Sequence, residues 1–121
     1  MITSMFNLQH LKLIYVHRNL REIETLIKDL KTLKLLVLIS KSSEHRFQLN
    51  LESGSLIKLN FVNFYLNCIR LRKLQGLIKL RYLKITNYVG EGVNGEELRE
   101  EFGEFGWAVK ITRRNVVCSK V

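Results

Sequence analysis

The sequence predicts an α/β solenoid, with about five parallel strands on one wall and helices or a hairpin on the other. Two observations carry this prediction. Short segments share the apolar pattern Leu-x-x-Leu-x-Leu, and its middle apolar residue recurs at positions 11, 36, 59, 83 and 109, in steps of 25, 23, 24 and 26 residues. A fixed period in this range is typical of stacked repeats, in which neighbours cover each other's apolar faces.

The copies place apolar residues at the same three positions, except that Gly106 replaces the first leucine of the fifth copy. In chain order they contain Leu8, Leu11, Leu13; Leu33, Leu36, Leu38; Leu56, Leu59, Phe61; Leu80, Leu83, Ile85; and Val109, Ile111. Over about residues 6 to 113 the pattern resembles the leucine-rich repeat family. The resemblance implies one binding domain, 1–121, with repeats near 6–30, 31–53, 54–77, 78–103 and 104–121.

The repeats are irregular by the standard of that family. Its repeats usually carry Asn or Cys three places past the third leucine, where the side chain satisfies backbone groups of the loop. Here those places hold Val16, Lys41, Phe64, Tyr88 and Arg114. We therefore expect a variant member that lacks a buried polar ladder.

Each repeat suggests its own local structure. Strands are predicted at 9–15, 34–40, 81–87 and 107–112, and helices at 19–30, 65–78 and 94–105. Asn19 is expected to cap the first helix in a capping box with Glu22. Leu98, Phe102 and Phe105 are expected on the inner face of the last helix, which Gly106 would end.

The segment 46–61 departs from the strand–helix pattern. Phe47, Leu49 and Leu51 alternate with polar residues, a turn-like stretch follows at 52–55, and Leu59 and Phe61 alternate again. This predicts a β-hairpin, which would either form the outer-face strand of an irregular repeat or break the regular solenoid.

Composition and charge bound the class of protein. Apolar residues make up 46% of the 121 residues, which disfavours disorder, and no apolar run is long enough to predict a transmembrane helix. Cys68 and Cys118 stand in no spaced motif and the N-terminus lacks secretory features, so we expect an intracellular, cytoplasmic protein. Residues 1–88 carry 15 Lys and Arg against five Asp and Glu, so the body is basic and favours acidic partners.

The strand wall is the predicted binding surface. Side chains alternate along a strand, so residues between the inward leucines point outward and form three rows. The rows are His10, Leu35, Lys58, Tyr82, Ala108; Lys12, Val37, Asn60, Lys84, Lys110; and Ile14, Ile39, Val62, Thr86, Thr112. From them we predict partner contacts by His10, Lys12, Leu35, Val37, Lys58, Tyr82, Lys84 and Lys110, with the apolar residues as anchors and the lysines steering an acidic protein.

Two alternatives stay open for this surface. Leu35, Val37 and Ile39 could instead be covered by the chain itself, for example by the 46–55 segment. The first repeat begins with little to cover Leu8 and Leu11, so the chain could also pair at that edge or belong to a longer array or larger assembly.

No local motif indicates catalysis. The sequence contains no phosphate-binding loop, no Cys-x-x-Cys pair and no His-Glu-x-x-His, and His10, His17 and His45 are scattered. Glu100 and Glu101 are interpreted as part of a solvated helix face. We therefore predict no enzyme activity, no catalytic residues, no metal site and no cofactor.

A nucleic-acid partner is the alternative. Residues 82–114, which include Glu-Glu-Leu-Arg-Glu-x-Phe followed by Phe-Gly, resemble the first strand, first helix and second strand of an RNA-recognition motif. We expect the chain to reach Val121 before a third strand of that fold. A component of an RNA–protein particle would use the same wall, and Arg70, Arg72, Lys73 and Arg81 would contact phosphates.

Overall fold

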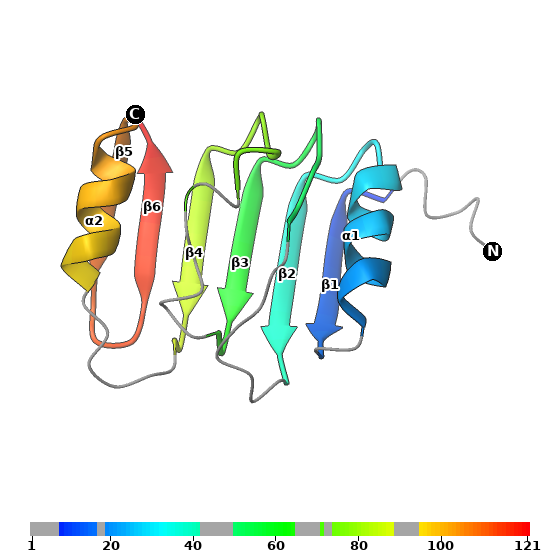
Figure 1. The fold of residues 1–121 in the computed structure, drawn as a ribbon, viewed down its shortest axis with the longest axis horizontal. Coiled ribbons are helices and arrows are strands. Elements are labelled where there is room, and N and C mark those ends of the chain that lie inside the picture. The colour runs from blue at the N-terminus through cyan, green and yellow to red at the C-terminus, as the bar shows by residue number, and fades with distance from the viewer. Residues whose placement is uncertain (1–7, 17–18, 42–49, 65–70, 72–73, 89–94) are drawn as a thin grey trace.

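The chain forms one mixed six-stranded sheet with two helices. The computed structural model describes residues 8–16, 19–41, 50–64, 71, 74–88 and 95–121. Its elements are β1 (His10–Tyr15), α1 (Leu20–Asp29), β2 (Leu35–Ser40), β3 (Lys58–Val62), β4 (Tyr82–Thr86), α2 (Gly95–Gly103), β5 (Trp107–Ile111) and β6 (Val116–Lys120). The sheet order is β1-β2-β3-β4-β6-β5 (Figure 1). The α/β class predicted from the sequence is confirmed.

The first four strands are parallel and aligned with the leucine period. Equivalent positions of consecutive copies are direct partners across the sheet, in the rungs Leu11, Leu36, Leu59, Leu83 and Leu13, Leu38, Phe61, Ile85. Of these, the six residues on β2, β3 and β4 are at most 1% exposed. The period therefore places the equivalent apolar residues of β1, β2, β3 and β4 side by side on the same side of the sheet.

The backbone repeats as regularly as the side chains. The carbonyl oxygens of Gln9, Lys34 and Ile57 each accept hydrogen bonds from two consecutive amides at the start of the next strand, at 2.7–3.1 Å. Each strand is thus positioned by the residue that precedes its neighbour.

The fifth strand differs from the expected all-parallel arrangement. β6 lies between β4 and β5 and is antiparallel to both. Because β6 is antiparallel to both of its neighbours, β5 runs in the same direction as β1 to β4, although it does not pair with β4. A tight connection causes the reversal: after β5 the amide of Thr112 donates to the carbonyl of Asn115 at 2.9 Å.

The first helix is placed as predicted but begins differently. Ile23, Ile27 and Leu30 are buried, as the apolar stripe indicated. The capping box is wrong, because the side chain of Asn19 makes no capping hydrogen bond to the helix. Its Oδ1 instead accepts from the amide of Val16 at 3.0 Å and its Nδ2 donates to the carbonyl of Ile14 at 3.1 Å, which ties the helix start to the end of β1.

The second helix is shorter than predicted. It ends at Gly103, and Gly106 follows with a φ of +86°. Leu98 and Phe102 are buried, but Phe105 is 58% exposed because it lies beyond the last helical turn. Its predicted place on the inner face is therefore wrong.

The middle of the chain corrects two further expectations. Both edges of β3 are occupied, by β2 and β4, so Leu59 and Phe61 do not belong to a local hairpin; residues 42–49 lie outside the described residues. Residues 74–80 form turns with a single bridge between Ser53 and Leu77, not the end of a helix. The rest of that predicted helix, 65–70 and 72–73, is not described.

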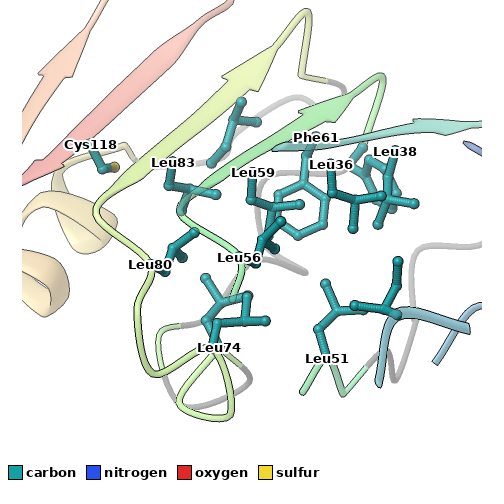
Figure 2. Packing of buried hydrophobic residues seen from close by; sticks show 14 of the residues in the cluster. Leu36, Leu38, Leu51, Leu56, Leu59, Phe61, Leu74, Leu80, Leu83 and Cys118 are labelled. Carbon is teal, nitrogen blue, oxygen red and sulfur yellow. The ribbon is translucent and has the colours of Figure 1, made fainter. Parts of the chain in front are cut away.

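The core fills the space between the sheet and the helices. Both helices lie on the same side of the sheet (Figure 1), and their buried residues share one cluster with the inward side chains of all six strands. Figure 2 shows leucines of β2, β3 and β4 in contact with those of the connecting segments, such as Leu51, Leu56 and Leu74, with Cys118 of β6 at the margin. The opposite side of the sheet carries no described helix.

Candidate functional site

The helix-free side of the sheet, which we call the open face, collects the predicted binding residues. Inward residues of each strand are packed in the core, so their neighbours along the strand point to the other side. The structure brings all eight predicted residues onto the open face: His10, Lys12, Leu35, Val37, Lys58, Tyr82, Lys84 and Lys110.

The predicted rows are continuous across the sheet. Register pairs Lys12 with Val37, Asn60 and Lys84 in turn. β6 inserts Val117 between Lys84 and Lys110, and it inserts Ser119 between Tyr82 and Ala108. The rows persist despite the unexpected topology because β5 keeps the direction, and hence the side-chain parity, of the parallel strands.

The open face carries an apolar strip on β2, near one edge of the sheet, with lysines on the strands to either side of it. His10, Lys12, Lys58 and Lys110 are exposed and Lys84 is half-buried, and no strand position on this face holds Asp or Glu. Leu35, Val37 and Ile39 of β2 are half-buried, and Ile14 on the neighbouring strand is 54% exposed. The described residues therefore leave an apolar strip in contact with water, with Lys12 on one side of it and Lys58, Lys84 and Lys110 on the other.

Polar contacts order the side chains beside this strip. Thr86 donates its hydroxyl to Oδ1 of Asn60 at 2.9 Å, across β3 and β4. Nζ of Lys58 lies 5.8 Å from the centroid of the Tyr82 ring, within the range of a cation–π contact. Tyr82 thus presents its ring beside a fixed positive charge.

An asparagine pair marks the ends of two repeats. Asn63 and Asn87 follow β3 and β4 with φ of 62° and 50°, a left-handed conformation that asparagine tolerates. Nδ2 of Asn87 donates to Oδ1 of Asn63 at 2.7 Å. From the sequence such residues were expected one position later, at Phe64 and Tyr88, and the shift of one position hid the asparagine pair. Asn87 is exposed, unlike the buried ladder of the family.

The described residues include one cysteine, Cys118, one histidine, His10, and several Asp and Glu side chains. They contain no group of three or more His, Cys, Asp or Glu side chains that could hold a metal ion. Burial raises the pKa of the Cys118 thiol to about 12, so it stays protonated and is a poor nucleophile. His17, His45 and Cys68 lie outside the described residues.

Residues 82–114, which resemble part of an RNA-recognition motif, are followed by a third strand, β6. β4, α2 and β5 are followed by β6, which lies between β4 and β5, so the expectation that the chain ends before such a strand is wrong. The short Val-Val-Cys run at 116–118 was the available signal for this strand. Arg81 is exposed just before β4, whereas Arg70, Arg72 and Lys73 are not described.

Comparison with protein-family models, curated proteins and solved structures found no significant match. None of the helices in the described part of the chain is long and apolar enough to cross a membrane. The open face is therefore the feature from which a function is argued.

Proposed function

We propose that this chain is a non-catalytic interaction scaffold, a short variant of the leucine-rich-repeat type, that binds an acidic or amphipathic protein segment through the open face. Four in-register parallel strands at the repeat spacing support the repeat interpretation. The single observation that carries the function is the apolar strip on β2 flanked by lysines, with no carboxylate among the strand positions of this face.

The two parts of the face have different roles in binding. Apolar side chains such as Leu35 and Val37 gain most from being covered, because hot spots lie at desolvated centres of interfaces. Exposed lysines such as Lys12 and Lys110 steer an acidic partner and orient it, and they contribute less to affinity. The partner should therefore combine an apolar centre with carboxylates on both sides.

Strand spacing predicts how far apart those carboxylates lie. Lys12 and Lys84 occupy the same row three strand steps apart, and Lys84 and Lys110 two steps apart. At about 4.8 Å per step the separations are about 14 and 10 Å. On a helical partner lying along the row, same-face acidic residues eleven and seven residues apart, about 16 and 10 Å, come nearest to these separations, with an apolar residue over Val37 between the first two.

Nucleic-acid binding is the second candidate, and the strand order β4-β6-β5 with α2 favours considering it. Sheets that bind single-stranded RNA stack bases on several aromatic side chains. The described strand positions of the open face offer the ring of Tyr82 and, three strands away, the imidazole of His10, and β6 presents Val117 and Ser119. This composition favours the protein partner.

The discriminating experiment is capture of partners from lysate with and without nuclease, eluted in a salt series. Val37→Asp places a charge in the apolar strip and should abolish capture of a protein partner, while weakening phosphate binding much less. Thr25→Asp, which places the same charge at an exposed position of α1 on the other side of the sheet, is the matched control and should leave capture unchanged. Captured material that disappears with nuclease or moderate salt would contradict the scaffold proposal, because phosphate contacts release counterions.

A further inference from the structure

Exposed apolar side chains gather at one end of the sheet, away from the open face. The described residues contain four exposed large hydrophobic residues: Ile14, Ile78, Phe105 and Val121. All but Ile14 line two adjoining hollows at the end where β4 and β5 begin and β6 ends. Figure 1 shows these strand ends at the top of the sheet. Contiguous exposed apolar surface of this kind marks an interaction site more often than scattered single residues do.

The hollows have an apolar floor. Their volumes are about 330 and 450 Å³, and they share Ile78, Leu80 and Lys120. Leu80 is 5% and Trp107 7% exposed, so the floor belongs to the core and is held in place. The amide of Lys120 donates to the carbonyl of Arg81 at 2.9 Å, which fastens the end of β6 to the start of β4.

The rim of the hollows is positive. Lys79, Arg81 and Lys120 are exposed there, and among the described residues no Asp or Glu lines either hollow. Nζ of Lys120 lies 5.7 Å from the centroid of the Trp107 ring, so one cation stands directly over the apolar floor. An occupant with an apolar group beside negative charge would match this pattern.

We propose that these hollows form a second docking site, which binds a short acidic peptide segment of a partner protein. An apolar or aromatic side chain of the segment enters the hollow beside Trp107, and its carboxylates pair with Lys79, Arg81 and Lys120. Ile78 and Phe105 are 75% and 58% exposed on the rim. A small amphiphilic anion inside the hollow would leave them in water, whereas a peptide chain covers them.

A peptide library displayed on phage and selected on the whole protein tests this site. Enriched sequences should combine an apolar or aromatic residue with adjacent Asp or Glu. Synthetic versions should change the fluorescence of Trp107, which is the only tryptophan of the chain. Lys120→Glu and Ile78→Ser should each weaken their binding at least about tenfold.

Controls separate this site from the open face. Val37→Asp and Ile14→Ser alter exposed or half-buried apolar residues of the open face and should leave the selected peptides bound with unchanged affinity. Octanoate serves as the small-anion probe and should not compete with them. The proposal is overturned if no sequence is enriched over a selection on Ile78→Ser, if enriched peptides lack acidic residues, if octanoate competes, or if Val37→Asp alone removes binding.

Discussion

Truncating Leu59 to alanine tests the placement of the repeat most directly. Leu59 is 0% exposed on the central strand β3, between Leu36 and Leu83 of the same rung. The substitution removes roughly three methylene-sized groups, and at about 0.8 kcal/mol each their lost burial lowers the free energy of unfolding by about 2.4 kcal/mol. Neighbouring strands on both sides prevent collapse, so a cavity term raises the expected loss to about 3–4 kcal/mol.

The assay is urea unfolding of Leu59→Ala, with thermal unfolding as a second measure. For a chain of this length the loss should lower the Tm by roughly 10–18 °C. Lys58→Ala is the matched control one residue away on the open face, and it should cost at most about 1 kcal/mol because its contact with Tyr82 is exposed. Equal losses for both variants, or a larger loss for Lys58→Ala, would refute the assignment of faces.

Three more predictions follow from single contacts. A Cβ added at Gly76 would lie 2.6 Å from the carbonyl oxygen of Leu51, so Gly76→Ala should cost about 1–3 kcal/mol in urea unfolding, whereas Gly103→Ala, with open space around it, should cost nothing. Asn87→Val should cost about 1–2 kcal/mol in the same assay because φ is 50° there, and Asn87→Gly should cost less. Burial raises the pKa of Cys118 from 9.0 to about 12, so between these pH values the unfolded chain releases the thiol proton and the folded chain keeps it. The free energy of unfolding should therefore fall by up to about 1.4 kcal/mol per pH unit above pH 9.0. In unfolding measured as a function of pH, Cys118→Ala should reduce this slope.

The sequence predicted the parallel strands best, because the alternation of side chains along a strand fixes which residues lie on each face of the sheet. The leucine period set the rungs of β1 to β4, and strand alternation then placed residues such as Lys12 and Val37 on the open face without further information. The same alternation of side chains explains why Lys110 lies on the open face as predicted, although β6 was not predicted from the sequence. Whether these residues bind a protein stays a prediction.

Other features depended on contacts that no local pattern encodes. Asn19 and Glu22 have the spacing of a capping box, but the side chain of Asn19 bonds to the backbone of Ile14 and Val16 at the end of β1 instead. β6 is short and its turn, Arg113-Arg114, lacks the Gly or Asn that usually signals a hairpin. The hollows beside Trp107 are assembled from segments around 71–80, 105–107 and 120–121, so no single stretch of sequence could reveal them.

The paired backbone hydrogen bonds at Gln9, Lys34 and Ile57 have a consequence for how such a chain can change over evolutionary time. They locate each strand from its neighbour, so the connecting segments can differ in length where they carry no buried residue such as Leu51, Leu56 or Leu74. Doubling a flexible loop costs only about 0.6 kcal/mol in closure entropy. A change of loop length at such a place would leave the register of β1 to β4 unchanged, and with it the spacing of Lys12 and Lys84 across the open face.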